Sequence, residues 1–391
     1  MKRILSLILA VAAFYACGPK DPGYVIKGQA GDLDGKAVLT YETPEGEAVN
    51  DTVAMNKGRF VFKGIVSDVV SGGLSLLPVG SDPLHYSMYI ENCPITLDIN
   101  PEKVIDYAQY GGKLLSDVKV AGGPNNVFAQ ALVEAQKAPS KMPEFKELAT
   151  AMEEVRSMGY ADMAAYQQKQ MEVQNRFADQ IPAYYEAIQE AINECIAGAP
   201  DVEAAVSMFN SYGSSLPLEE YEAGFNKFSE KARGSFLAKD AREELAARKA
   251  TAPGAVAPDF TLNDPDSNPV TLSSLRGQYV IVDFWASWCK PCRAGVPAMK
   301  ELYKKYHPKG LEIIGVSDDS NLDAWKTAIA QDQTPWIHVC DEFPEENKPA
   351  RVGSLWGVHY IPSYFLLDKE GKVIGKMDHD ELAAKLAELL D

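Results

Sequence analysis

Hydrophobic and polar residues alternate over short distances in the first part of the chain. Between residues 24 and 100, short segments rich in Val, Ile, Thr, Tyr and Phe are separated by Gly, Asp and Asn turns. The run Arg-Phe-Val-Phe-Lys-Gly at 59–64 is one example. Alternation with a period of two is typical of half-buried strands. The pattern predicts an N-terminal antiparallel β domain, which we assign to residues 24–115.

The middle of the chain follows a helical period instead. From residue 124 to 248 glycine becomes rarer, and apolar residues recur three and four positions apart among Ala, Glu, Gln and Lys. This spacing predicts amphipathic helices, so we assign a helical region to residues 116–250. Its Met and aromatic positions are interpreted as helix core. The run Thr-Ala-Pro-Gly-Ala-Val-Ala-Pro at 251–258 breaks the pattern and is interpreted as a linker.

Strand-like and helix-like segments alternate after this linker. Such alternation predicts a mixed sheet with helices on both faces, an α/β domain over residues 259–391. The expected strands are 279–286, 311–316, 336–339, 364–368 and 372–377, and the expected helices are 289–306, 321–331 and 380–390.

The first residues have the pattern of an export signal. Lys2 and Arg3 precede an apolar run that ends at residue 16, which is too short to span a bilayer as a stable helix. We therefore expect a signal peptide at 1–16. The Ala-Cys-Gly that follows resembles a bacterial lipobox, in which Cys17 would be lipidated and 17–23 would form a tether. The alternative is an ordinary secretory signal with an incidental cysteine. We expect a lipid-anchored, periplasm-facing protein of the bacterial cell envelope.

The chain is strongly acidic. Its formal charge is -17 at a sequence pI near 4.8, and loss of Lys2 and Arg3 with the signal would make the charge -19. Such a balance argues against nucleic acid as a partner. The acidic pairs Asp318-Asp319 and Glu345-Glu346 are interpreted as solvated loops.

Two closely spaced cysteines lie where a buried strand should give way to a helix. Cys289 and Cys292 are separated by two residues, a spacing that allows a disulfide within one helical turn. A helix N-terminus favours the thiolate form, Lys290 adds positive charge, and Pro291 fits the first turn. We expect Cys289 to be the exposed attacking thiol and Cys292 the more buried resolving thiol.

A lone Cys-x-x-Cys could also be half of a zinc site or a purely structural disulfide. A zinc site needs a second ligand pair, and neither the five histidines nor the remaining cysteines supply one at short spacing. Cys93, Cys195 and Cys340 are far apart and are expected to be isolated thiols, the alternative being a pairing of Cys93 with Cys195 or Cys340. Arg293 follows Cys292, which excludes the haem attachment pattern. We therefore expect a redox dithiol with no metal and no cofactor.

Asp283 interrupts the apolar strand six residues before Cys289. A carboxylate among apolar residues should have a raised pKa, and it could take the proton from the Cys292 thiol. The alternative is a structural aspartate whose hydrogen bonds are satisfied.

Four segments of the C-terminal region resemble the TlpA/ResA-like thiol-disulfide oxidoreductases of the thioredoxin superfamily. They read Ala-Pro-Asp-Phe-Thr-Leu at 257–262, Val-Thr-Leu-Ser-Ser-Leu-Arg-Gly at 270–277, Phe-Trp-Ala-Ser-Trp-Cys-Lys-Pro-Cys-Arg at 284–293 and Tyr-Ile-Pro-Ser-Tyr-Phe-Leu-Leu-Asp at 360–368. The N-terminal β region is similar to a domain of unknown function that precedes thioredoxin domains in envelope lipoproteins of Gram-negative bacteria.

This resemblance implies roles for individual residues. Cys289 would be the nucleophile, Cys292 would resolve the mixed disulfide, and Asp283 would be the buried acid behind it. Pro362 would be a cis-proline facing the dithiol, a trans turn proline being the alternative, and the Ile361 backbone would pair with the substrate. The residues expected to contact the substrate are Trp288, Lys290, Pro291, Ile361 and Pro362. The family often has Glu where Gly295 stands, so any role of that Glu is absent or moved.

Taken together, these features predict an envelope thiol-disulfide oxidoreductase. Its partners would be protein disulfides or dithiols and a membrane redox donor or acceptor, with the direction of electron transfer left open. A thiol peroxidase is one alternative, because peroxiredoxins share the Ala-Pro-Asp-Phe opening. They place a threonine three residues before their reactive cysteine, where this chain has Ala286. The other alternative is a non-catalytic envelope binding lipoprotein that uses the thioredoxin fold as a scaffold.

Overall fold

The computed structural model describes residues 23–107, 112–158, 162–342 and 350–391. The chain divides into two compact units, one reaching Leu216 and including Glu220–Ala241, the other comprising Pro217–Glu219 and Arg242–Asp391. The expected signal peptide and Cys17 lie outside the described residues. Within the described ranges, no helix is both long enough and apolar enough to cross a membrane.

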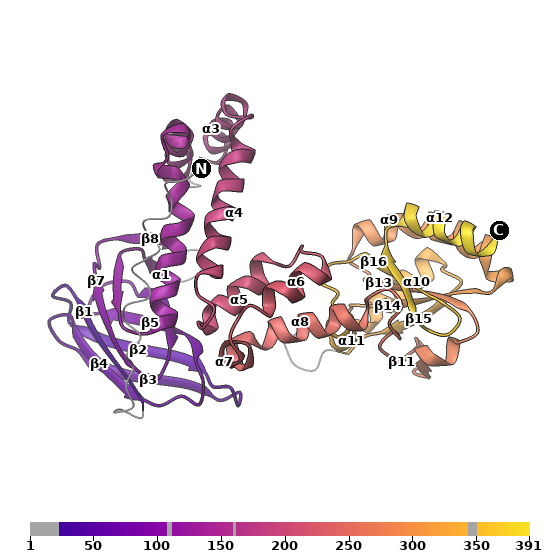
Figure 1. Ribbon diagram of the computed structural model, residues 1–391, viewed down its shortest axis with the longest axis horizontal. Helices are drawn as coiled ribbons and strands as arrows, with labels where there is room; N and C mark the ends of the chain where they lie inside the picture. The colour runs from indigo at the N-terminus through magenta and orange to yellow at the C-terminus, as the bar shows by residue number, and fades with distance from the viewer. Residues whose placement is uncertain (1–22, 108–111, 159–161, 343–349) are drawn as a thin grey trace. The chain divides into compact units, whose positions relative to one another are not determined.

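The β domain of the first unit consists of two sheets (Figure 1). Most strand pairs are antiparallel, as predicted, but β1 pairs with β7 and β6 pairs with β9 in parallel. The four-stranded sheet has the order β10 (Val118–Ala121), β7 (Pro94–Ile99), β1 (Tyr24–Ala30) and β4 (Arg59–Gly64). The six-stranded sheet has the order β3 (Ala48–Met55), β2 (Gly35–Glu42), β5 (Val70–Pro78), β6 (Leu84–Ile90), β9 (Gly112–Leu115) and β8 (Val104–Tyr107).

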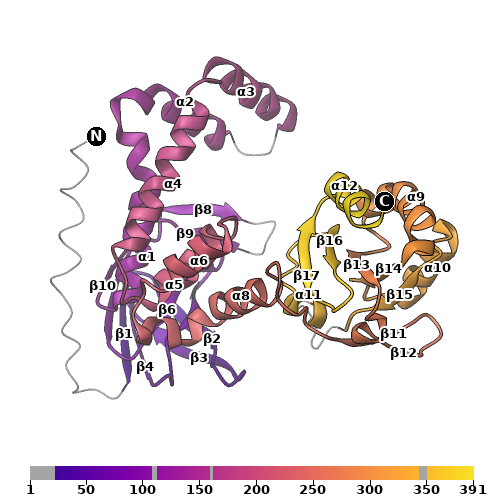
Figure 2. The ribbon, with the colours of Figure 1, turned by 45° about the vertical axis from the view of Figure 1, so that its right-hand side comes forward.

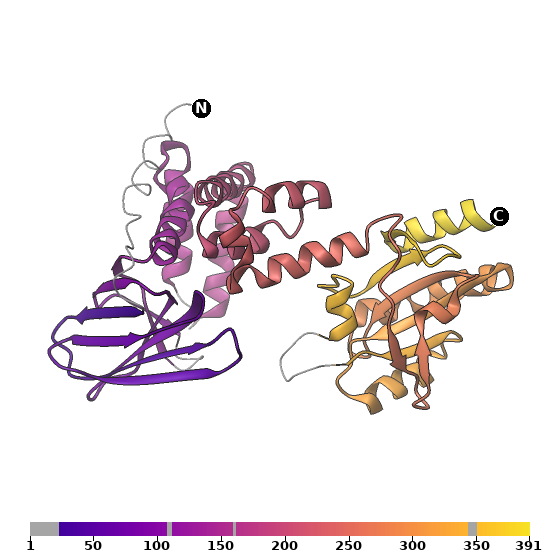
Figure 3. The same cartoon turned by 60° about the horizontal axis from the view of Figure 1, so that its bottom comes forward.

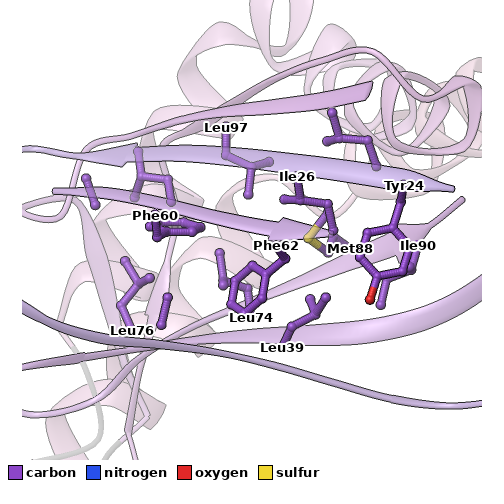
Figure 4. Close-up of a cluster of buried hydrophobic side chains, with 14 of the residues drawn as sticks. Tyr24, Ile26, Leu39, Phe60, Phe62, Leu74, Leu76, Met88, Ile90 and Leu97 are labelled. Atoms are coloured by element: carbon purple, nitrogen blue, oxygen red, sulfur yellow. The ribbon is translucent and has the colours of Figure 1, made fainter. Parts of the chain in front are cut away.

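Apolar side chains from both sheets fill the core of this β domain (Figure 4). In β1, buried and more exposed positions alternate along the strand, so Tyr24 and Ile26 face inward. Phe62 of β4 packs in the same cluster as Leu39 of β2 and Leu74 of β5. Burial of such a side chain stabilises the fold by about 1.5–3 kcal/mol.

The helical region of the first unit begins at α1, which lies beside α4 (Figure 3). A buried polar cluster joins α1 and α5 to the β domain: the Asn125 amide donates to Glu91 of the β domain and to Glu203 of α5, each at 3.0 Å. The α-helices are α1 (Pro124–Lys137), α2 (Lys146–Ser157), α3 (Met163–Arg176), α4 (Ile181–Ala197), α5 (Glu203–Tyr212), α6 (Leu218–Phe225), α7 (Glu230–Gly234) and α8 (Lys239–Ala250). Short 3₁₀ helices lie at Ala138–Lys141, Pro143–Phe145 and Phe236–Ala238.

The second unit contains a seven-stranded mixed sheet, which confirms the predicted α/β architecture. Strands β13, β14 and β15 are parallel, whereas β16 runs antiparallel to β13 and β17 antiparallel to β16. The strands are, in sheet order, β12 (Pro269–Thr271), β11 (Thr261–Asn263), β15 (Ile337–Cys340), β14 (Leu311–Ser317), β13 (Tyr279–Trp285), β16 (Ser363–Leu367) and β17 (Val373–Met377). The sequence did not predict β11 and β12, because three residues are too few to show a period.

Helices α9, α10 and α12 cover one face of this sheet (Figure 2). Met299 of α9 and Leu382 of α12 pack against Ile281 of β13, so alternate residues of β13, including Asp283, face these helices. The helices of this unit after α8 are α9 (Lys290–Tyr306), α10 (Leu322–Asp332), α11 (Arg351–Leu355) and α12 (His379–Leu390). Two further 3₁₀ helices lie at Leu272–Leu275 and His307–Lys309.

The division between the two units falls inside α8. The carboxylate of Glu244 in α8 lies 2.6 Å from Nε2 of His359, in the loop that leads to Ile361. The segment expected to be a linker hydrogen-bonds to the β17 region, with the Gly254 N–H donating to the Val373 carbonyl at 2.7 Å. The C-terminal part of α8 and the segment after it therefore pack against the rest of the second unit.

Candidate active site

The strand β13, a tight turn and the start of α9 carry the two cysteines. Every residue of β13 from Val280 to Trp285 is buried, which fixes the strand in the centre of the sheet. The Cys289 N–H donates to the Ala286 carbonyl at 3.1 Å and closes the turn. Cys289 is the N-cap of α9, and its sulfur accepts a hydrogen bond from the Cys292 N–H at 3.2 Å. The predicted strand-to-helix position of Cys289 is thus observed.

Cys289 and Cys292 form a disulfide, with their Cα atoms 5.3 Å apart. Both residues are buried, at 4% and 5% exposure. The expectation that Cys289 is the exposed cysteine was therefore wrong for the disulfide form. Its cause is the apolar cluster of Trp285, Trp325 and Ile361 that packs around both cysteines.

The other residues expected to contact a substrate lie around this disulfide. Ile361 packs against the cysteine cluster, and the Ile361–Pro362 peptide bond is cis. Trp288 is 62% exposed, and Lys290 and Pro291 are exposed in the first turn of α9. The site therefore has a buried disulfide with an exposed rim.

Asp283 lies in β13 on the face that α9 covers. It is 8% exposed, and burial raises the pKa of its carboxyl to about 7. Its Oδ1 atom is buried and accepts no hydrogen bond from the described residues. This argues against the alternative of a structural aspartate with both oxygens satisfied.

Tyr364 of β16 lies directly opposite Asp283 in the sheet. Burial and the negative charge of Asp283 both raise the pKa of the Tyr364 hydroxyl. That hydroxyl lies 3.4 Å from the point where a side chain at Gly295 would begin. A Glu at this position would thus contact Tyr364.

Asp319 is a residue of the site that the sequence interpretation missed. Its carboxylate accepts hydrogen bonds from the Ser287 N–H at 2.7 Å, the Ser287 hydroxyl at 2.6 Å and the Ser317 hydroxyl at 2.6 Å. It is 2% exposed, so the interpretation of this acidic pair as a solvated loop was wrong for Asp319. Because Ser287 lies two residues before Cys289, Asp319 holds the turn that carries the cysteine.

Two further titratable residues lie close to the site in β15. The Cys340 thiol donates to the Asp319 carbonyl at 3.2 Å, and burial raises its pKa to about 11, which makes it a poor nucleophile at neutral pH. Burial lowers the pKa of His338 to about 4, so its ring is neutral. Cys195 and Cys340 form no disulfide.

Comparisons with known families match two parts of the chain. Residues 253–376 match the AhpC/TSA family, and residues 24–127 match a Domain of unknown function (DUF4369). The second match agrees with the expected N-terminal β domain.

Individual proteins are similar to the C-terminal part. The thiol-disulfide oxidoreductase ResA of Bacillus thuringiensis is 34% identical over 137 residues, which are 35% of this chain and 76% of the relative. ResA of Geobacillus thermodenitrificans is 36% identical over 127 residues, 32% of this chain and 69% of the relative. The thioredoxin domain of a thiol-disulfide oxidoreductase from Bacteroides vulgatus is 33% identical, with a TM-score of 0.33, over 36% of this chain and 99% of that domain.

The match to ResA extends over most of the relative's length, and the AhpC/TSA match at 253–376 includes the segment that forms the disulfide in this structure. With the mixed sheet and the disulfide at the start of α9, the chain belongs to the TlpA/ResA-like thiol-disulfide oxidoreductases, enzymes of the thioredoxin superfamily.

Proposed function

We propose that Cys289 and Cys292 exchange disulfides with protein substrates in the bacterial cell envelope. The observation that carries this proposal is the disulfide between these two residues at the N-terminus of α9, with a buried carboxylate in the strand that precedes it. A helix N-terminus stabilises the thiolate that disulfide exchange requires.

The exchange proceeds in two balanced steps. The thiolate of Cys289 attacks one sulfur of a substrate disulfide, which forms a mixed disulfide and releases the other substrate sulfur as a thiolate. The thiolate of Cys292 then attacks the Cys289 sulfur, which closes the protein disulfide and releases the second substrate thiolate. Two electrons pass from the protein to the substrate, and the reverse sequence oxidises a substrate dithiol with the same residues.

Asp283 is the proposed acid-base group of the second step. Because the Cys292 thiol must lose a proton before it attacks, a nearby base accelerates the step. With a pKa of about 7, Asp283 is present in both protonation states at neutral pH. This matches the requirement that a general base and its conjugate acid be similarly populated at the working pH.

The proposed substrate-binding surface is the rim of the disulfide. Trp288 is mostly exposed next to Cys289, and Lys290 and Pro291 are exposed in the next turn. The backbone of Ile361 would pair with an extended substrate segment, with Pro362 beside the sulfurs. An exposed aromatic ring beside a backbone that can pair with a strand suits an unfolded or extended polypeptide.

We further propose that the protein is lipidated at Cys17 after removal of residues 1–16 and faces the periplasm. The support is the basic and apolar pattern of the first residues and the cysteine that ends it. Each round of exchange leaves the Cys289 and Cys292 pair in the opposite redox state, so a membrane donor or acceptor would restore it. We retain 24–115, 116–250 and 259–391 as the proposed domains, with 251–258 between the last two.

Trapping of mixed disulfides tests this function. In a Cys292→Ser variant the mixed disulfide on Cys289 cannot be resolved, so covalent partners should accumulate in envelope extracts. The matched Cys289→Ser variant has lost the attacking sulfur and should accumulate few. Non-reducing gels followed by mass spectrometry of the attached peptides measure both. Equal trapping by the two variants would contradict the assigned roles.

A thiol peroxidase is a second candidate, because the AhpC/TSA match covers the same region. In such an enzyme Cys289 would attack hydrogen peroxide and form a sulfenic acid, which Cys292 would convert to the disulfide with release of water. Residue 286 is Ala, which lacks the hydroxyl that this chemistry uses to hold peroxide. Consumption of peroxide by the reduced protein at a rate above that of free thiols would favour this candidate.

A further inference from the structure

Four residues form a row across the face of the sheet that α9 covers. Tyr364, Asp283, Gly315 and His338 occupy paired positions in the neighbouring strands β16, β13, β14 and β15. Side chains at paired positions of adjacent strands point to the same face. Gly315 has no side chain, so Asp283 and His338 flank a position of this row that carries only backbone.

Three buried polar atoms of Asp283, His338 and the nearby Trp285 have no hydrogen-bond partner among the described residues. They are Oδ1 of Asp283, Nε1 of Trp285 and Nδ1 of His338. A Cβ atom on Gly315 would lie 2.9 Å from the His338 nitrogen and 3.0 Å from the Trp285 nitrogen. Two nitrogen atoms therefore converge on the position where a side chain of residue 315 would begin. We call the space bounded by Asp283, Trp285, Gly315 and His338 the Gly315 notch.

The hydrogen-bonding capacities of these atoms are fixed by their chemistry. The indole nitrogen of Trp285 can only donate, and an ionised Asp283 can only accept. Nε2 of His338 lies 2.6 Å from the Thr334 hydroxyl. With burial lowering the pKa of His338 to about 4, the ring is neutral. If Nε2 carries the proton and donates to Thr334, Nδ1 is an acceptor.

One donor and two acceptors around a small polar space complement a single water molecule, which accepts one bond and donates two. Buried waters make about three such bonds to polar groups that would otherwise be unsatisfied. The separation of adjacent strands, about 4.8 Å, places Asp283 and His338 on opposite sides of the notch, too far apart to bond directly. A water above Gly315 would satisfy all three atoms at once.

We propose that the Gly315 notch binds one buried water, which accepts from Trp285 and donates to His338 and Asp283. His338 is then a positioning residue for the acid-base group, acting through this water. This inference rests on the acid-base role proposed for Asp283. It adds that a single water molecule, held by Trp285 and His338, hydrates the Asp283 carboxylate. A hydrogen bond to the ionised form favours that form, so the water keeps the pKa of Asp283 lower than a dry site would.

A titration of the Asp283 carboxyl by carbon NMR tests this proposal on the full chain with its disulfide intact. In Gly315→Ala the added methyl group would lie within 3.0 Å of the His338 and Trp285 nitrogen atoms, so it should prevent the water from binding between them. Loss of one hydrogen bond to a carboxylate corresponds to a rise of about one pH unit in the titration midpoint. Trp285→Phe removes only the donor to the water, and a smaller rise in the same direction is expected.

Trp336→Phe is the matched control. The Trp336 indole nitrogen is also buried without a partner in the described part of the chain, and its ring centroid lies 5.9 Å from that of His338. The three atoms nearest to a Cβ on Gly315 belong to His338 and Trp285 and not to Trp336, so the loss of the Trp336 nitrogen should leave the Asp283 midpoint unchanged. Should Gly315→Ala fail to fold, the comparison of Trp285→Phe with Trp336→Phe decides alone.

Two results would overturn the proposal. The first is that Trp285→Phe leaves the titration midpoint of Asp283 unchanged, or that Trp336→Phe shifts this midpoint as much as Trp285→Phe does. The other is a high-resolution crystal structure without an ordered water in contact with the three atoms. Both measurements use the oxidised protein without substrate. A failure of mixed-disulfide trapping would therefore reject the proposed function and leave the hydration of the notch as a separate result.

Discussion

The chemistry of the site depends on a few residues whose surroundings differ sharply. Asp283 and Asp319 are both buried carboxylates near the disulfide, but Asp319 accepts three hydrogen bonds whereas one oxygen of Asp283 accepts none. Asp319 therefore serves as a fixed anchor for the turn before Cys289. Asp283 has the raised pKa that proton transfer at neutral pH requires.

Burial of Asp283 should also make the stability of the C-terminal unit depend on pH. The pKa of about 7 in the folded protein lies above the ordinary aspartate value of 3.8, so the folded state binds the proton more tightly than the unfolded state does. Stability from this group is therefore fully present below pH 4 and is lost as the pH rises towards 7. A shift of this size corresponds to about 4 kcal/mol.

Asp283→Asn should remove this dependence. Relative to the variant, the wild-type free energy of unfolding is expected to fall by roughly 4 kcal/mol between pH 4 and pH 7. All five tryptophans lie between residues 285 and 356, so tryptophan fluorescence during urea unfolding reports on this unit. Asp266→Asn, at an exposed position, is the control. Parallel pH profiles of the wild type and Asp283→Asn would contradict the assignment.

The sequence predicted some of these residues and not others, for physical reasons. Cys289, Cys292 and Asp283 could be predicted because they lie close together in the sequence. The strand and the helix that carry them are both evident from the local pattern of apolar residues. Asp319 reaches Ser287 only through the parallel pairing of β13 with β14, which local spacing does not specify. Since the carboxyl ends of parallel strands meet at one edge, an acidic pair directly after a buried strand was the available signal.

At the scale of single elements, α9 determines the reactivity of the cysteines. Cys289 caps the helix and receives the Cys292 N–H, so the helix dipole favours a negative charge on its sulfur. Cys340 lies at the end of a strand, where burial raises its pKa to about 11. The two kinds of thiol should differ clearly in reactivity.

Alkylation rates of the reduced protein measure this difference. The rate at which Cys289 reacts with iodoacetamide should rise with pH. The midpoint of this rise should lie below the pKa of free cysteine, about 8.5. Cys340 is expected to remain unmodified in the folded protein at neutral pH. Peptide mapping after timed alkylation assigns each rate. Modification of Cys340 as fast as Cys289 would show that α9 confers no special reactivity.

Helix α8 was predicted as a helix, but its packing against the C-terminal unit was not. Its Glu244 bonds to His359 and to Arg248, and a side chain at Gly357 would lie 3.4 Å from Ala247. The contacts of Glu244 with His359 and of Ala247 with Gly357 join residues more than a hundred positions apart, so no local pattern indicates them.

Removal of α8 should therefore weaken the thioredoxin-like unit. A fragment that begins at Lys239 is expected to be more stable than one that begins at Thr251. The loss of the partly buried hydrogen bond between Glu244 and His359, together with the packing of Ala247, corresponds to about 2 kcal/mol. Urea unfolding followed by fluorescence compares the two fragments. Equal stability would mean that α8 contributes nothing to this unit.

At the scale of the whole molecule, the sequence predicted the type of secondary structure in each region. It did not predict which strands of the β domain pair with one another. Antiparallel neighbours in the β domain follow from short hairpins, whereas the parallel pairs of β1 with β7 and β6 with β9 join distant segments. In the C-terminal unit the alternation of strands and helices was sufficient, because parallel strands require the helical crossovers that the pattern shows.

We infer that the pair of Cys289 and Cys292 is a redox centre and not a structural disulfide. The most direct test equilibrates the purified protein with glutathione buffers of known ratio and counts the free thiols of each cysteine by alkylation and mass spectrometry. We predict one two-electron transition, confined to these two residues, within the range of about -120 to -270 mV found for thioredoxin-like proteins. A pair that stays oxidised below about -300 mV, as structural disulfides do, would contradict the account.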